Sequence, residues 1–249
     1  MDLSLTNKIA LVTGGSTGIG LAAAQELARQ GAKVFITGRR QEELDAAVDT
    51  IGSSATAIRA DVTVQSDLDR IYSQIATTAG RLDILFANAG GGDMLPLGAI
   101  TEEHFDRIFG TNVRGVLFTV QKALPLLTHG ASIILTSSTA SIQGTANFSV
   151  YSASKAAVRN FARSWALDLK DRAIRVNAVS PGPVRTPGLG GLAPDEARQG
   201  LFDYLASQIP LGRLGEPEEI GKAVAFLASD AASFVNGVEL FVDGGMAQV

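Results

Sequence analysis

The stretch TGGSTGIG (13–20) follows the apolar run KIALVT (8–13) and leads directly into a helical pattern. A glycine-rich turn between a buried strand and a helix presents backbone N–H groups at the helix N-terminus, where the pyrophosphate of a dinucleotide can bind. Gly14 allows a sharp turn, Gly18 allows the backbone to approach a phosphate, and Gly20 allows close packing of helix on strand. The spacing is G-x3-G-x-G, which differs from the common G-x-G-x-x-G fingerprint. Its place at the first strand–helix junction favours dinucleotide binding over a purely structural turn.

The rest of the chain continues this alternation of strands and helices. Apolar, β-rich runs predict strands at 8–13, 33–37, 56–60, 82–88, 131–138, 174–180 and 238–242. Helical patterns lie at 18–30, 41–51, 65–79, 101–128, 150–171 and 217–228, with a kink expected near Pro125. Strands that alternate with helices form parallel sheets through right-handed crossovers. We therefore predict an α/β fold, in which residues 1–249 form a single doubly wound Rossmann domain with a seven-stranded parallel sheet and helices on both faces.

A proline-rich segment interrupts the alternation late in the chain. Residues 183–212 contain four prolines and are long for a loop in a compact domain. Long loops of this kind commonly carry function. We expect the part at about 187–212 to form a substrate lid with some helix of its own.

Composition excludes several classes of function. The chain has 249 residues, a net charge of −4 and no cysteine, so disulfides, thiolate metal sites and cysteine nucleophiles are excluded. Its basic residues are scattered, which argues against nucleic acid as a partner. Neither an apolar run of membrane-spanning length nor a signal-peptide pattern is present, and we expect a cytoplasmic protein. Metal-ligand spacing is absent as well, so we predict no metal, and we expect His104 and His129 to be ordinary surface residues.

The end of the second predicted strand bears on the choice of cofactor. The sequence there reads TGRR (37–40), so Gly38 occupies the position where an acidic residue would bind the ribose 2′-OH of NAD. Arg39 and Arg40 follow, and a guanidinium group suits a 2′-phosphate through charge-assisted hydrogen bonds. The pattern favours NADP(H), with Arg39 the stronger candidate. The alternative is that both arginines belong to a solvated helix start.

Further motifs occur in a fixed order along the chain. They are FANAG (86–90), TNVRG (111–115), the serine that ends ILTSS (134–138), YSASK (151–155), NAVSPG (177–182) and NGVELFVDGG (236–245). With the glycine loop, these motifs resemble the short-chain dehydrogenase/reductase family over essentially all of the chain. More narrowly, the chain resembles bacterial NADP-dependent secondary alcohol dehydrogenases that serve as ketone reductases.

The resemblance implies roles for individual residues. It makes Asn112, Ser138, Tyr151 and Lys155 the catalytic set, with Asn112 bending the long helix and holding a water. It also matches Asn88 with a residue that stabilises the central sheet. The predicted cofactor-binding set is Gly14, Ser16, Thr17, Gly18, Ile19, Gly20, Gly38, Arg39, Arg40, Asp61, Val62, Asn88, Ala89, Gly90, Tyr151, Lys155, Pro181, Gly182, Val184 and Thr186.

The spacing of Tyr151 and Lys155 fits this chemistry independently. A helix places residues i and i+4 on one face, so the phenol and the ammonium group can enter one cleft. A free phenol has a pKa near ~10, and a nearby cation favours the phenolate. Ser152, Ala153 and Ser154 are small enough to let cofactor and substrate approach. We therefore expect Tyr151 to transfer the proton as general acid or base and Ser138 to hydrogen-bond the carbonyl oxygen.

The predicted function is interconversion of hydrophobic ketones and secondary alcohols by hydride transfer with NADP(H). Apolar side chains around the predicted cleft favour a small hydrophobic substrate. They are Met94, Leu95, Ile142, Phe148, Leu189, Leu192, Leu201, Phe202, Tyr204 and Leu205. One alternative is a 3-oxoacyl-[acyl-carrier-protein] reductase, for which Lys170, Arg172 and Arg175 would be a thin docking surface. Another is a catalytically idle dinucleotide-binding sensor. The resemblance further implies a homotetramer.

Overall fold

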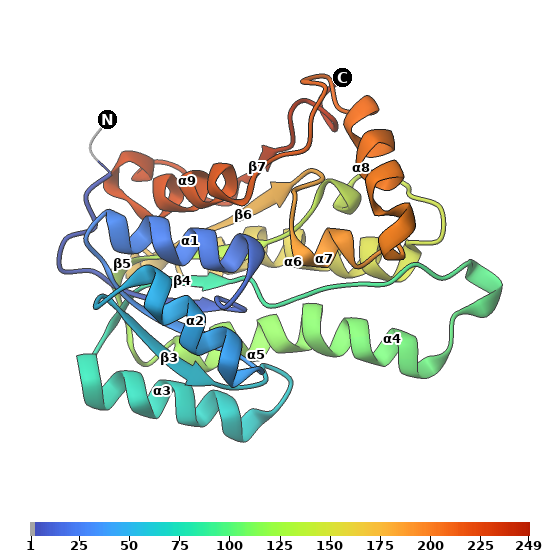
Figure 1. Cartoon of the computed structure of the whole chain (residues 1–249). Coiled ribbons are helices and arrows are strands. Elements are labelled where there is room, and N and C mark those ends of the chain that lie inside the picture. The colour runs from blue at the N-terminus through green and yellow to red at the C-terminus, as the bar shows by residue number, and fades with distance from the viewer. Residues whose placement is uncertain (1–2) are drawn as a thin grey trace.

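The computed structural model describes residues 3–249, and within that range the strands form one seven-stranded sheet (Figure 1). Its strands are β1 (Ile9–Thr13), β2 (Lys33–Gly38), β3 (Ala55–Arg59), β4 (Leu82–Ala87), β5 (Leu127–Thr136), β6 (Arg175–Pro181) and β7 (Glu239–Val242). They are parallel and lie in the order β3-β2-β1-β4-β5-β6-β7. The strand order reverses between β1 and β4, as in a doubly wound fold. The predicted fold class is confirmed.

Helices cover both faces of the sheet. One apolar core joins the sheet to α3 (Gln65–Ala79), α5 (Val116–Ala123) and α6 (Ser149–Asp168). The other joins it to α1 (Gly18–Arg29), α2 (Gln41–Ile51) and α9 (Pro217–Ala228). Successive strand residues enter opposite cores, as Leu11 and Val12 do, because side chains alternate along a strand. Burial of both faces explains why the central strands β1 and β4 are almost entirely apolar.

The helix predicted over 101–128 is present from Glu102 to Ala123, and its predicted end and its predicted kink at Pro125 are wrong. The structure has α4 (Glu102–Phe109), a wide π-helical turn at Gly110–Gly115, and then α5, which ends at Ala123. Pro125 does not kink a helix but lies between α5 and β5, since proline lacks the N–H that would continue the helical hydrogen bonds. β5 starts at Leu127, earlier than predicted, because Leu127 pairs with Leu82 of β4.

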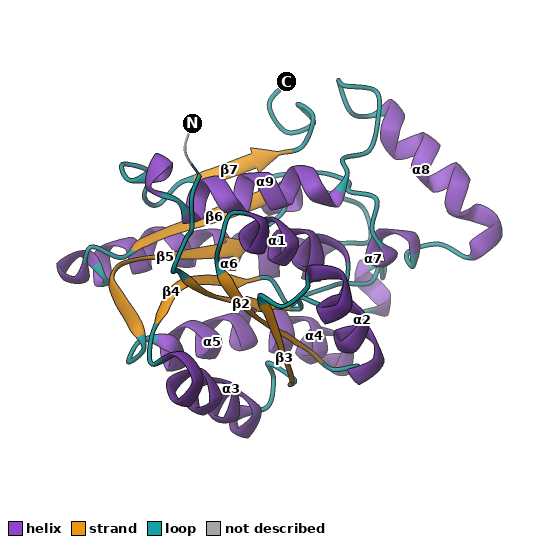
Figure 2. Cartoon of the chain, turned by 60° about the vertical axis from the view of Figure 1, so that its left-hand side comes forward, coloured by secondary structure: helices purple, strands orange, loops and turns teal. Residues whose placement is uncertain are grey.

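The segment predicted as a lid contains helix, as expected. It folds into the short α7 (Pro187–Gly190) and α8 (Arg198–Ser207), joined through a single turn at Asp195–Ala197. Figure 2 shows α8 standing away from the sheet at the edge of the molecule. None of the side chains of α8 is buried, so this helix is held loosely compared with the helices on the sheet.

Candidate active site

The loops after β1, β4, β5 and β6 meet at one edge of the sheet, because the strands are parallel and share a carboxyl end. Asn88, which follows β4, ties three of these strands together. Its side-chain nitrogen donates to the carbonyls of Thr13 (3.1 Å) and Gly14 (3.3 Å), and its side-chain oxygen accepts from the Thr136 hydroxyl (3.1 Å). The glycine loop is thereby fixed against the centre of the sheet.

The glycine loop has the conformation that its composition predicts. Gly14 and Gly18 have φ of 63° and 55°, a region that favours glycine. A Cβ on Gly20 would lie 2.0 Å from the carbonyl oxygen of Gly14, so no side chain fits there. Thr17 precedes α1 without a side-chain capping bond, which leaves the first N–H groups of the helix available to a phosphate.

The segment after β6 approaches this loop from the other side. The side chain of Thr186 lies 3.3 Å from where a Cβ of Gly18 would be, and its hydroxyl accepts from the backbone N–H of Leu189 at the start of α7 (3.1 Å). Gly182 donates to the Val242 carbonyl (3.1 Å) and has no room for a side chain against Asp243. The glycine loop and the segment after β6, both predicted to bind the cofactor, therefore lie next to each other.

Asn112 sits in the π-helical turn and is completely buried. Its side-chain oxygen accepts from the Gly91 N–H (3.0 Å), and its nitrogen donates to the Gly91 carbonyl (2.9 Å) and to the Ser154 hydroxyl (2.9 Å). Ser154 in turn donates to the carbonyl of Tyr151 (2.7 Å). The amide of Asn112 therefore clamps the loop after β4 to the helix that carries Tyr151.

Tyr151, Lys155 and Ser138 lie together. The Lys155 ammonium nitrogen is 5.5 Å from the centre of the Tyr151 ring and donates to the Thr136 carbonyl (2.8 Å). The hydroxyl of Ser138 is hydrogen-bonded to the Tyr151 phenol. The neighbouring Ser137 points the other way, as the strand geometry predicts, and donates to the Lys155 carbonyl (3.0 Å).

Burial controls the protonation of this group. It lowers the pKa of Lys155 from 10.5 to about 8, and the side chain is only 4% exposed. Burial also raises the pKa of Tyr151, with the Ser138 hydrogen bond partly offsetting it. This direction is opposite to the one expected from a neighbouring lysine alone, because the loss of water on burial is the largest influence on the pKa of the phenol. At neutral pH the phenol is therefore protonated, which is the form a general acid requires.

A cavity of about 520 Å³ lies at the ends of β2 and β3. Its lining includes the exposed Arg39 together with Asp61, and also Arg59 and Arg70, which the sequence reasoning missed. Arg40 is engaged elsewhere, in an ion pair with Glu43 (3.3 Å). The signal that could have revealed Arg59 is its position at the C-terminal end of a strand that neighbours β2. Among the predicted pair, Arg39 is thus the one at this cavity.

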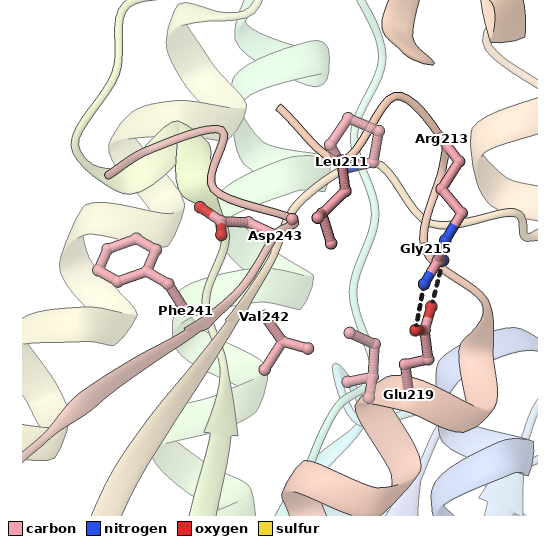
Figure 3. A pocket seen from close by; sticks show the side chains of 10 residues that line it. Leu211, Arg213, Gly215, Glu219, Phe241, Val242 and Asp243 are labelled. Carbon is pink, nitrogen blue, oxygen red and sulfur yellow. Dashed lines mark hydrogen bonds and ion pairs between the residues drawn. The ribbon is translucent and has the colours of Figure 1, made fainter. Parts of the chain in front are cut away.

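Figure 3 shows a second hollow, of about 250 Å³, between the end of β7 and the start of α9. Arg213 donates two hydrogen bonds to Glu219 there (2.8 and 2.7 Å). Asp243 accepts from the backbone N–H groups of Gly245 and Ala247. The charged groups of this hollow thus have partners within the protein.

One histidine prediction is wrong. His104 is only 6% exposed, because the amphipathic α4 packs this side chain inward next to α6, and neither ring nitrogen has a hydrogen-bond partner. His129 is exposed, as predicted. Within residues 3–249 no group of three or more His, Cys, Asp or Glu side chains could hold a metal ion, and no helix there is long and apolar enough to cross a membrane.

Comparison with known proteins decides the family. Residues 14–247 match a family model described as enoyl-(acyl carrier protein) reductase. The chain is 49% identical to the oxidoreductase asL5 of Sarocladium schorii, with 98% of each chain covered. It is 39% identical to the hydroxynaphthalene reductase-like protein Arp2 of Metarhizium robertsii, with 97% of this chain and 96% of the relative covered. A crystal structure of 3-ketoacyl-(acyl-carrier-protein) reductase from Brucella melitensis, complexed with NADH, superposes with a TM-score of 0.91 at 32% identity and covers 98% of this chain and 100% of that chain.

This chain belongs to the short-chain dehydrogenase/reductase family. It is accordingly an oxidoreductase, and the family uses a nicotinamide dinucleotide. The two curated relatives just named are fungal proteins, so the narrower likeness to bacterial secondary alcohol dehydrogenases is not what these matches show. As a short-chain dehydrogenase/reductase, the protein has its motifs at the carboxyl edge of the sheet, where the geometry above brings them together.

Proposed function

We propose that this protein is an NADP(H)-dependent carbonyl reductase that interconverts hydrophobic ketones and secondary alcohols, in the manner of an NADP-dependent secondary alcohol dehydrogenase. The observation that carries the proposal is the cluster of Ser138, Tyr151 and Lys155, with the pKa of Tyr151 raised and that of Lys155 lowered to about 8. The residues around the cluster fit a dinucleotide. The glycine loop leads into α1, whose first N–H groups have no side-chain cap and are available to a pyrophosphate.

The chain's own groups perform the proton chemistry. NADPH, when bound, supplies the hydride. Ser138 donates a hydrogen bond to the substrate carbonyl oxygen and stabilises the negative charge that develops on it. Tyr151 delivers its phenolic proton to that oxygen, and the Lys155 ammonium group favours the phenolate that remains. Asn112 holds the loop after β4 against α6, and so keeps these groups in register.

The preference for NADP(H) rests on the cavity that contains Arg39 and Arg59. Two guanidinium groups near one cavity would bind a 2′-phosphate, and charge-assisted hydrogen bonds of this kind are worth ~1.5–3 kcal/mol each. Arg39→Ala is therefore expected to weaken NADPH binding by about 10- to 100-fold and to leave NADH binding unchanged. Titration of protein fluorescence with each cofactor measures this. Arg40→Ala is the matched control, since Arg40 pairs with Glu43, and equal losses in the two variants would contradict the assignment.

The substrate class rests on apolar side chains near the cluster. Phe148 stacks on Tyr151 with ring centres 4.3 Å apart, and Ile142 and Met94 are exposed beside the same loops. These groups favour a hydrophobic, flat substrate. The name of the relative Arp2 points in the same direction, toward fused aromatic rings.

A 3-oxoacyl-[acyl-carrier-protein] reductase remains the second candidate, because the Brucella structure carries that name. Its docking surface is weaker than the sequence predicted. Arg175 is buried and donates to the carbonyls of Leu227 and Ser229, and Arg172 donates to those of Leu124 and Leu127. Arg172 and Arg175 are thus both bonded to backbone carbonyls, and of the three basic residues only Lys170 is left to attract an acidic carrier.

We further propose a cytoplasmic homotetramer. Phe105 is 44% exposed and stacks on Phe109 at 4.3 Å, so α4 presents an aromatic surface that another copy could cover. Light scattering of the purified protein measures the assembly. A monomer in solution would contradict this part of the proposal.

The deciding experiment follows NADPH oxidation at 340 nm with aryl ketones, alkyl ketones, hydroxylated naphthalenones and an acetoacetyl thioester. Wild type and Tyr151→Phe are compared, with NADH in parallel. We expect turnover of hydrophobic ketones by the wild type and its loss in the variant. Preference for the thioester would support the second candidate, and cofactor binding without any turnover would support an idle sensor.

A further inference from the structure

Three consecutive glycines follow β4, and each lies against a group of the proposed site. A Cβ on Gly90 would be 3.0 Å from the side-chain oxygen of Asn112 and 3.4 Å from the Lys155 nitrogen. Gly91 exchanges two hydrogen bonds with Asn112. A Cβ on Gly92 would be 2.4 Å from Cδ2 of Tyr151 and 2.9 Å from its Cβ and Cγ. The third glycine therefore lies directly against the tyrosine ring.

Space, and not backbone conformation, requires glycine at position 92. Gly92 is not among the glycines with positive φ, so alanine is compatible with its backbone. Carbon atoms in contact normally lie ~3.5–4.0 Å apart, and a distance of 2.4 Å demands that something move by about 1 Å. The loop is anchored on both sides, by Asn112 at Gly91 and by the Leu95 N–H, which donates to the Asn147 carbonyl (2.7 Å).

The tyrosine ring has a second neighbour that fixes it. Phe148 stacks on the ring with an interplanar angle of 22°. The backbone of Tyr151 is held in α6, where its carbonyl accepts from Ser154. Rotation of the ring relieves the contact with Cδ2 but leaves Cβ of Tyr151 in place, so the loop after β4 and the ring must both shift, which carries the phenol out of register with Ser138 and Lys155.

We propose that Gly92 is a positioning residue for Tyr151. Its missing side chain lets the loop after β4 lie against the ring and, together with Phe148, holds the phenol in register with Ser138. The inference rests on the proposed function, in which Tyr151 transfers the proton. It adds a residue that touches neither the substrate nor the cofactor in that mechanism.

The test is Gly92→Ala, with Gly98→Ala as the matched control. Gly98 belongs to the same loop and has open space at its Cβ position. A displacement of about 1 Å can cost ~10²-fold in rate, so we expect kcat of Gly92→Ala to fall by 10- to 100-fold. NADPH affinity should match the wild type, and the thermal unfolding temperature should fall by only a few degrees because the added methyl group overpacks a close contact. Gly98→Ala should match the wild type in every respect.

The pH profile separates positioning from general damage to the fold. The Ser138 hydrogen bond lowers the pKa of Tyr151, so a displaced phenol should lose this contribution. In the direction of alcohol oxidation, the rising limb of kcat should therefore move to higher pH in Gly92→Ala. In a Tyr151→Phe background, Gly92→Ala should cause no additional loss. A crystal structure of Gly92→Ala should show the ring rotated.

The outcomes distinguish the two proposals. Wild-type turnover by Tyr151→Phe would overturn the proposed function and this inference with it. An inactive Tyr151→Phe together with a Gly92→Ala that keeps wild-type kcat and pH profile would overturn the inference alone. The inference alone would also be overturned if NADPH affinity fell by the same factor as kcat in an unstable Gly92→Ala protein, or if its crystal structure showed the ring unmoved.

Discussion

Replacing Lys155 with methionine is expected to stabilise the folded protein at neutral pH and to abolish its reductase activity. Lys155 is 4% exposed, and burial lowers its pKa from 10.5 to about 8. Each tenfold change in a proton dissociation constant corresponds to ~1.4 kcal/mol, so holding the ammonium group in the folded protein costs about 3 kcal/mol. Methionine has similar length and no charge. It loses the hydrogen bond to the Thr136 carbonyl, worth ~1 kcal/mol, which leaves a net gain of about 2 kcal/mol at pH 7.

The gain should depend on pH in a defined direction. Below pH 8 the lysine is protonated in both folded and unfolded chains, and the folded state bears the full cost. Between pH 8 and 10.5 the unfolded chain holds more protons than the folded chain, so the stability of the wild type rises with pH. The advantage of Lys155→Met should therefore shrink by about 2 kcal/mol between pH 7 and pH 9.5.

Urea unfolding of both proteins at pH 7, 8, 9 and 9.5, at one chain concentration, measures the difference. Comparison of the two proteins cancels the titration of Tyr151, which both retain. A wild type that is more stable than Lys155→Met at pH 7, or a difference that does not change with pH, would refute the reasoning. Assay of the same samples should show activity only in the wild type.

Two further predictions concern packing and buried polar groups. The Glu239 carboxylate accepts hydrogen bonds from the hydroxyls of Ser141 (2.6 Å) and Ser180 (2.8 Å), and Ser141 lies three residues after Ser138. Glu239→Leu should lower the free energy of unfolding by about 3 kcal/mol and reduce kcat. Glu239→Gln keeps an acceptor oxygen, so it should lower the free energy of unfolding by less than about 1 kcal/mol, as measured by urea unfolding. Equal destabilisation by the two variants would contradict this prediction. A Cβ on Gly221 of α9 would lie 2.8 Å from the Ala22 carbonyl oxygen, whereas Gly200 of α8 has open space. Thermal unfolding should show Gly221→Ala destabilised by ~1–3 kcal/mol and Gly200→Ala stabilised by ~0.5–1 kcal/mol, and the opposite order would count against the described helix packing.

The local sequence pattern was sufficient to predict most of the helices and strands. α9 begins at Pro217 and ends at Ala228, as predicted, because proline at its first position and an apolar stripe mark it in the sequence. β2 was predicted to within one residue, since a strand buried on both faces reads as an unbroken apolar run. The glycine loop could be placed because Gly14 and Gly18 adopt positive φ values, which glycine accepts most readily.

Long-range contacts decided the elements that sequence reasoning missed. The resemblance implied a bend at Asn112, but the contacts that hold the π-helical turn there reach across to Gly91 and Ser154, which the sequence did not predict. His104 looked polar enough for the surface, and packing of α4 buried it. The arginine at position 59 gained a candidate role only when β3 was placed beside β2.

The sequence by itself determined the doubly wound fold, the family, and which residue types could carry the chemistry, because strand–helix alternation, glycine conformation and helical spacing are local properties. The tertiary structure alone decided how those residues are tuned. The pKa of Tyr151 is raised and that of Lys155 is lowered because neighbouring elements exclude water from both. Gly92 meets the Tyr151 ring only because the loop after β4 lies beside the start of α6, which is distant along the chain. Desolvation and close contact depend on which surfaces meet, and a chain acquires those surfaces only when it folds.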